Sequence, residues 1–114
     1  MPDHPGLMAM TKVEVVVEGT DAPLVEQLVT QAGASGFTAV SNVSGLGHGG
    51  YHQGQLQFND RNALSLLIVV LPTERADDLI AGLRHLFDRR PGVLLVSDVW
   101  VSRPDYFTSQ SPGS

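Results

Sequence analysis

The segment Leu64–Leu71 (LSLLIVVL) constrains the fold more than any other part of this sequence. A strand points alternate side chains to opposite faces of its sheet, and here both alternating sets are apolar. Such a run, bounded by Pro72, is typical of a strand that is covered on both faces. The later segment Val93–Val101 (VLLVSDVWV) is also apolar on both sides. The chain therefore has to cover two faces of a sheet.

The first half of the chain is predicted to form a strand, a helix and a second strand. Valines at every second position predict a strand over Lys12–Gly19. A helix follows, with Thr20 or Asp21 as its N-cap, proline in its first turn and an apolar stripe that ends at Gly33. β-branched and aromatic residues then predict a strand over Phe37–Ser44.

The second half repeats this pattern after a long connection. Gly45–Asn62 has no periodicity and is rich in glycine, which loses the most conformational entropy on ordering, so a mobile loop is expected. After the strand Leu64–Leu71, Thr73 is placed to cap a helix with apolar residues three and four apart. The turn Arg89–Gly92 ends that helix before the strand Val93–Val101. The order βαββαβ predicts a ferredoxin-like α+β sandwich, an antiparallel sheet with two helices on one face.

The length of 114 residues supports one domain, which we place at residues 12–103. Residues 1–11 and 104–114 contain turn formers without periodicity, and we expect a disordered N-terminal tail and a flexible C-terminal tail. Two helices can cover only one face of the sheet, and the remaining segments are too short to cover the other. Because monomers rarely leave such an apolar patch in water, the sequence predicts an oligomer whose sheets pack face to face.

Composition argues against several classes of function. Without cysteine there is no disulfide framework, thiolate metal cluster or catalytic thiol. Seven basic against twelve acidic side chains give a net charge of −5, which disfavours nucleic-acid binding. The longest apolar run is too short to span a bilayer and the N-terminus has no basic leader, so we expect a cytoplasmic protein. With no triad, Walker loop or paired acid and base, no catalytic residue and no enzymatic activity are predicted.

Two motifs lie in the glycine-rich segment. Gly45 and Gly47 form a G-x-G at the end of the second strand, where backbone N–H groups can form a nest for an anion. A flexible connection is the alternative interpretation. His48 and His52 are four residues apart, a spacing that binds zinc or copper on a helix, although the glycines between them disfavour a helix.

Arginines flank the last strand. Arg89, Arg90 and Arg103 are three of only seven basic residues, and guanidinium groups suit phosphate oxygens. For the first two, stabilisation of the preceding helix C-terminus is an equally good explanation. Asp98, inside this apolar strand, is expected to face a polar partner or an oligomer seam, and His85 is expected at the surface or its boundary.

Together these residues resemble the PII superfamily of trimeric signalling proteins. The resemblance covers nearly the whole folded unit through residues 33–50 (GASGFTAVSNVSGLGHGG), 66–83 (LLIVVLPTERADDLIAGL) and 93–104 (VLLVSDVWVSRP). Its most specific part is the G-[FM]-T tripeptide, here at 36–38, followed by the G-x-G at the base of the T-loop. The resemblance implies a homotrimer with adenine nucleotides bound in the clefts between neighbours.

The resemblance also implies roles for individual residues. The tripeptide at 36–38 would line the adenine and ribose, and the T-loop base would meet the phosphates. The adjacent subunit would supply Arg90 and Gly92 before the last strand and Arg103 near its end. The nucleotide-binding residues implied are Gly36, Phe37, Thr38, Gly45, Gly47, His48, Arg89, Arg90, Gly92 and Arg103.

The short loop before the last strand and the compact glycine-rich T-loop, about residues 45–62, resemble the PII-like branch associated with carboxysomes and bicarbonate transport. This implies ADP or AMP as ligand and bicarbonate as co-ligand, held by Gly47, His48 and Arg103, with no metal. A bicarbonate transporter or a carboxysome component is the implied partner of the T-loop. Two alternatives stay open: a small ferredoxin-like enzyme, and a trimer that binds a divalent metal through His48 and His52.

Overall fold

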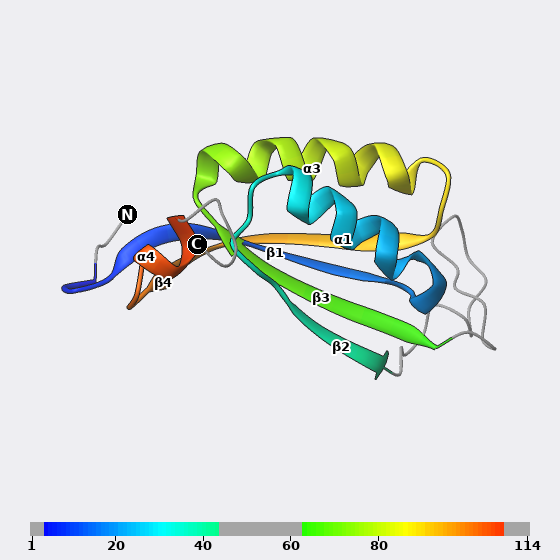
Figure 1. Cartoon of the computed structure of the whole chain (residues 1–114), viewed down its shortest axis with the longest axis horizontal. Helices are drawn as coiled ribbons and strands as arrows, with labels where there is room; N and C mark the ends of the chain where they lie inside the picture. Colours follow the sequence, from blue (N-terminus) through cyan, green and yellow to red (C-terminus); the bar gives the residue numbers. More distant parts are fainter. Residues whose placement is uncertain (1–3, 44–62, 109–114) are drawn as a thin grey trace.

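The computed structural model describes residues 4–43 and 63–108. Its elements in chain order are β1 (Met8–Glu18), the short 3-10 helix η1 (Gly19–Asp21), α1 (Ala22–Gln31), β2 (Thr38–Val43), β3 (Leu64–Leu71), α3 (Thr73–Phe87), β4 (Gly92–Val101) and α4 (Asp105–Thr108). The strands form one antiparallel sheet in the order β2-β3-β1-β4, and α1 and α3 lie on the same face of it (Figure 1). The predicted ferredoxin-like α+β fold is confirmed. None of the helices in these residues is long and apolar enough to cross a membrane.

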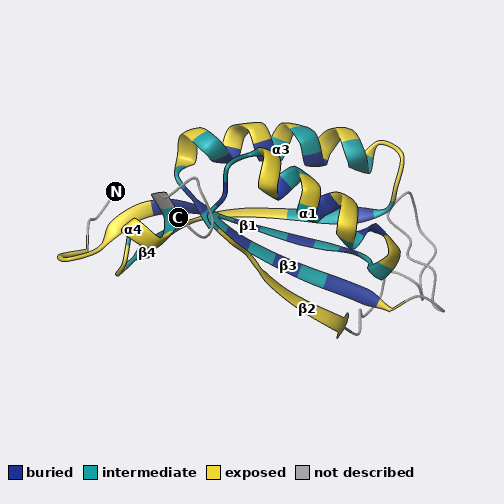
Figure 2. Ribbon diagram, in the orientation of Figure 1, coloured by how far each residue is buried: buried dark blue, intermediate teal, exposed yellow. Residues whose placement is uncertain are grey.

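The apolar core fills the space between the sheet and the two helices, where Figure 2 shows the buried segments. Val13 and Val15 of β1 lie opposite Val69 and Leu67 of β3, and all four are fully buried. Burial of each such side chain contributes about 1.5–3 kcal/mol relative to exposure. The helices add the buried side chains of Val25, Val29, Ala76, Leu79 and Leu83.

The other face of the sheet has no helix on it. Strand partners point to the same face, so the pairing of Val16 with Leu66 and Val93, and of Glu14 with Ile68 and Leu95, places these residues on the face away from the helices. Leu95 is 52% exposed. The face is not uniformly apolar, because Lys12 and Glu14 of the central β1 form an ion pair of 3.4 Å on it. Apolar residues of β3 and β4 flank this charged pair.

The first strand starts earlier than the sequence pattern indicates. β1 begins at Met8 instead of Lys12, because residues 8–11 pair with the last four residues of β4 and satisfy their backbone groups. Before β1, the ring of His4 packs edge-to-face against the ring of Trp100, with 4.8 Å between the ring centroids. At the other terminus, Asp105–Thr108 forms α4. Residues 1–3 and 109–114 of the two predicted tails lie outside the described residues.

The first helix begins at the predicted N-cap, whereas the second does not. Asp21 is the N-cap of α1, but its side chain makes no capping hydrogen bond. Thr73 is the first residue of α3 and does not cap it; the N-cap is Pro72, and the Thr73 hydroxyl instead bonds the buried hydroxyl of Thr11 at 2.8 Å. Gly33 does end α1, with a φ of +81° that glycine adopts without strain.

The second strand contains an irregularity that the sequence pattern does not reveal. The register of β2 against β3 shifts between Ser41 and Val43. The intervening Asn42 has a φ of +59°, a left-handed conformation that asparagine tolerates better than most residues. This bulge lies immediately before the glycine-rich segment.

Candidate functional site

The strand register places one group of candidate residues at the end of the sheet where β1 runs into η1, which we call the η1 end. Here Val17 of β1 pairs with Gly92 of β4, while Glu18 pairs with Leu64 of β3. Leu64 in turn pairs with Val43 of β2. β2 therefore ends and β4 begins at this same end, on opposite edges of the sheet. The two segments predicted to meet phosphate are attached at these two points.

An ion pair fixes the side chain of Arg90 at the η1 end. Its Nη1 donates a hydrogen bond of 2.7 Å to Oδ1 of Asp21. The Asp21 side chain is only 5% exposed, whereas that of Arg90 is 50% exposed. One side of the guanidinium is thus held by a buried carboxylate, and the rest of the group is accessible to solvent.

The turn that carries the arginines is closed by backbone hydrogen bonds onto α3. The N–H groups of Arg89 and Arg90 both donate to the carbonyl of Leu86, at 3.1 Å each. These two N–H groups therefore satisfy the hydrogen bonding of a carbonyl at the C-terminus of α3. The side chain of Arg89 is exposed. Gly92 follows and is buried. A Cβ at this position would overlap the ring of Phe87. Gly92 thus has a packing role within the chain in addition to its predicted place in the site.

A second group gathers at the opposite end of the sheet, which we call the α4 end. The guanidinium of Arg103 lies over the ring of Tyr106, and its Nη2 donates to the phenolic oxygen. The hydroxyl of Ser35 donates to the backbone carbonyl of Tyr106, which joins α4 to the turn before β2. The predicted adenine-binding residues 36–38 follow Ser35 directly, and the ring of Phe37 is 41% exposed. A Cβ at Gly36 would meet no atom of the described chain within 4 Å, so packing within the chain does not require glycine there.

The two groups are far apart within one chain. β4 runs from Gly92 at the η1 end to Val101 near the α4 end (Figure 1). The nine steps from Gly92 to Val101, at ~3.3 Å each, give β4 a length of about 30 Å. That one neighbouring subunit supplies both Arg90 and Arg103 to one nucleotide stays a prediction.

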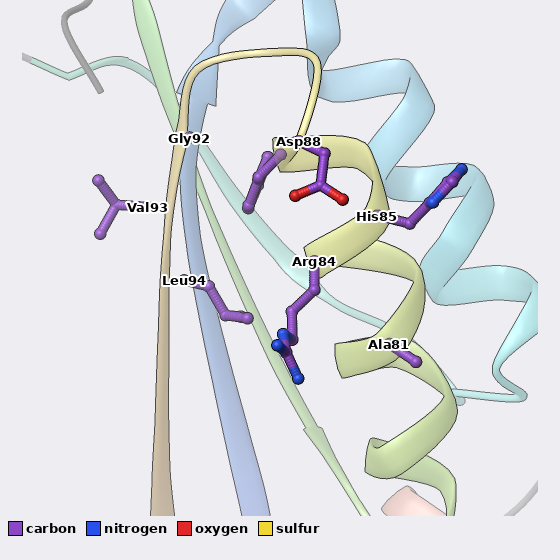
Figure 3. A pocket seen from close by; sticks show the side chains of 8 residues that line it. Ala81, Arg84, His85, Asp88, Gly92, Val93 and Leu94 are labelled. Carbon is purple, nitrogen blue, oxygen red and sulfur yellow. The ribbon is translucent and has the colours of Figure 1, made fainter. Parts of the chain in front are cut away.

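A groove of about 560 Å³ lies between α3 and the beginning of β4 (Figure 3). In Figure 3 the side chains of Arg84 and Leu94 converge in this groove, whereas Val93 points away from the helix. His85 is exposed here, as expected. The groove is lined by Ala81, Arg84, His85, Phe87, Asp88, Gly92, Val93 and Leu94. Of the predicted nucleotide-binding residues that the structure describes, only Gly92 lines it.

Several predicted residues lie outside the described part of the chain: Gly45, Gly47, His48 and His52, with the rest of the predicted T-loop at residues 45–62. Within residues 4–43 and 63–108 there is no group of three or more potential metal-ligating His, Asp or Glu side chains. Asp98 is exposed in β4, opposite the buried Thr11 in the strand register.

Sequence reasoning missed two residues that the structure ties to the predicted site. Asp21 has the residue type and position of a helix cap, so nothing in the local pattern connects it with Arg90, 69 residues away. Tyr106 falls in a segment that looks like a tail. Its spacing of three residues from Arg103 was a usable signal, because side chains three apart meet within one helical turn.

Comparison with protein families gives a match to the nitrogen regulatory protein P-II family over residues 10–106. Comparison with functionally curated proteins gives no match.

Among solved structures, the chain is similar to CPII from Thiomonas intermedia K12. The CPII structure bound to ADP, AMP and acetate has 32% sequence identity and a TM-score of 0.78, over 90% of this chain and 98% of that one. The CPII structure bound to ADP, AMP and bicarbonate has 34% identity and a TM-score of 0.75, over 90% and 97%. A putative PII-like signalling protein from Thermus thermophilus, at 21% identity and a TM-score of 0.72 over 90% and 98%, shares the fold.

These matches extend through every element described above, from β1 to the short helix that carries Tyr106. The family model begins within β1 and ends within α4, and so includes both groups of candidate residues. The sequence match and the shared fold therefore show that the chain belongs to the P-II family of nitrogen regulatory proteins.

Proposed function

We propose that this protein is a regulatory protein that binds ADP or AMP in clefts between its subunits and has no enzymatic activity. The observation that carries the proposal is the similarity, over 90% of the chain, to CPII, whose solved structures hold ADP, AMP and bicarbonate. The exposed guanidinium groups at both ends of the sheet provide the charge that phosphate oxygens require.

In this proposal three subunits pack their sheets around a threefold axis. The sheet face without helices supplies the contact surface, and its exposed Leu95 and half-buried Ile68 and Val16 would be buried there. Assembly is also needed for the site itself. In the proposed site, Arg89, Arg90 and Gly92 of one chain share the nucleotide with Gly36, Phe37, Thr38 and Arg103 of a neighbouring chain.

Bicarbonate is the proposed co-ligand. A small oxyanion next to the nucleotide phosphates would be held by Arg103, together with Gly47 and His48 at the T-loop base. The bicarbonate in CPII supports this assignment. We extend the proposal to a role in inorganic-carbon regulation, with a bicarbonate transporter or carboxysome component as the partner of the T-loop. A cytoplasmic location is part of the same proposal.

Calorimetric titration tests nucleotide binding directly. AMP, ADP, ATP and cyclic AMP are titrated into the full-length protein in bicarbonate-free buffer and again with bicarbonate present. We expect ADP and AMP to bind, with tighter binding when bicarbonate is added. At about 100 times its dissociation constant, ADP should stabilise the fold by about 2.7 kcal/mol, which a thermal melt detects. Absence of both heat and thermal stabilisation with every nucleotide would refute the proposal.

A further inference from the structure

Asp21 is the one charged residue that is buried in the described part of the chain, with 4% of its surface exposed. A carboxylate removed from water is strongly destabilising unless a partner compensates its charge. The fold supplies that partner in Arg90, whose Nη1 lies 2.7 Å from Oδ1 of Asp21. The fold thus keeps a buried carboxylate beside the guanidinium of Arg90.

Helix capping does not explain this carboxylate. Asp at an N-cap normally accepts a hydrogen bond from the backbone N–H two or three residues later. Asp21 occupies the N-cap of α1 but makes no such bond. Its hydrogen bond goes to a side chain 69 residues away in sequence, in the turn between α3 and β4.

The pair leaves most of the arginine available. A guanidinium has five N–H donors in a rigid planar fork. Among the described residues, the hydrogen-bond partner of this fork is Asp21. Because the Arg90 side chain is 50% exposed while its partner is 5% exposed, the guanidinium is fixed from inside and presented outward.

We propose that Asp21 is a positioning residue that holds Arg90 ready for the diphosphate of ADP. This inference rests on the proposed function, in which Arg90 contacts phosphate. Asp21 affects binding in two opposite ways: it fixes the rotamer of a long side chain before the ligand arrives, and it offsets part of the positive charge. The proposal is that the positioning effect is the larger of the two.

The sign of the effect provides the test. The Asp21→Asn variant removes the charge but keeps the shape, so a purely electrostatic role predicts tighter ADP binding. Positioning predicts binding that is about 5–10-fold weaker, less than the full loss of a hydrogen bond to a charged group, because the Asn side-chain oxygen can still accept from Arg90. Adenosine, which has no phosphate, should bind Asp21→Asn and wild type equally. The Asp77→Asn variant, which neutralises an exposed acid on α3, is the matched control and should bind ADP as wild type does.

A double-mutant cycle separates positioning from general damage. Arg90→Ala should weaken ADP binding at least as much as Asp21→Asn, and the double variant should be no weaker than Arg90→Ala alone. If Asp21→Asn does not fold, Asp21→Ser replaces it, since serine also suits an N-cap while lacking the carboxylate. A structural role alone would lower adenosine and ADP affinity together.

Three results would overturn the inference: unchanged or tighter ADP binding by Asp21→Asn, additive effects in the cycle, or an equal loss for adenosine. Failure of the proposed function has a different signature, because wild-type protein would then bind neither ADP nor AMP. That result removes both the function and the role of Asp21, whereas wild-type binding with an insensitive Asp21 variant removes only the latter.

Discussion

The guanidinium of Arg103 lies over the ring of Tyr106, with Cζ 4.7 Å from the ring centroid and Nη2 2.9 Å from the phenolic oxygen. The tyrosine thus holds the proposed phosphate-binding arginine through its ring and through its hydroxyl. The hydroxyl of Ser35 donates a hydrogen bond to the backbone carbonyl of the same tyrosine. This bond connects the pair to the residues proposed to bind adenine.

Removal of this support should weaken nucleotide binding moderately. An exposed cation–π contact contributes about 0.5–1 kcal/mol, so Tyr106→Ala should raise the dissociation constant for ADP about 3-fold in calorimetry. Arg103→Ala should raise it at least about 10-fold, since a hydrogen bond to a charged group contributes about 1.5–3 kcal/mol. Tyr106→Phe keeps the ring but loses the hydrogen bond from Arg103, so its dissociation constant for ADP should lie between those of wild type and Tyr106→Ala. Arg103→Ala that binds ADP normally would exclude this arginine from the site.

Two adjacent residues of β4 test the packing of subunits. Leu95 and Val96 are 52% and 48% exposed, but their strand partners Glu14 and Val13 place them on opposite faces of the sheet. Leu95→Arg puts a charge on the face without helices and should dissociate the proposed trimer, as measured by light scattering after size-exclusion chromatography. Val96→Arg, on the helix side, should leave the trimer intact. Equal behaviour of the two variants would place the subunit contact elsewhere.

The packing of Phe87 on Gly92 separates structural from binding effects at the predicted site. Gly92→Ala places a methyl group into the ring of Phe87 and should destabilise the protein by about 1–3 kcal/mol in denaturant unfolding. Adding Phe87→Leu should recover part of this loss, because the smaller side chain makes room. If stability does not recover, the cost of Gly92→Ala arises from something other than this contact.

The bulge in β2 should tolerate glycine but not a β-branched residue. Asn42 has a φ of +59°, and a left-handed conformation costs an ordinary residue about 1–2 kcal/mol. Asn42→Val should therefore lower the free energy of unfolding by about that amount, measured at fixed protein concentration. Asn42→Gly should change it by less than about 0.5 kcal/mol. Similar stabilities for the two variants would show that the bulge rearranges.

The elements that could be predicted are those whose signal is local. The apolar run Leu64–Leu71 forms β3 with the predicted boundaries, and the three-and-four spacing after Thr73 forms α3. Gly33 ends α1 because its own backbone conformation favours glycine. In each case the determining interactions lie within one strand, one helix or one turn.

The predictions from the sequence are wrong where a residue far away in the sequence determines the local structure. Residues 8–11 lack a strand pattern, yet they join β1 because the end of β4 needs backbone partners. Thr73 has the residue type of a cap, but its hydroxyl bonds Thr11, 62 residues away. Neither partner can be found from the neighbouring sequence.

The sequence by itself determined the order of strands and helices, the apolar character of β3 on both faces and the family, because these follow from residue patterns along the chain. Only the tertiary structure decided that Asp21 holds Arg90 and that Tyr106 holds Arg103. The physical reason is that a charged side chain is fixed by whichever partner the fold brings to it, and here those partners come together only when the sheet has formed.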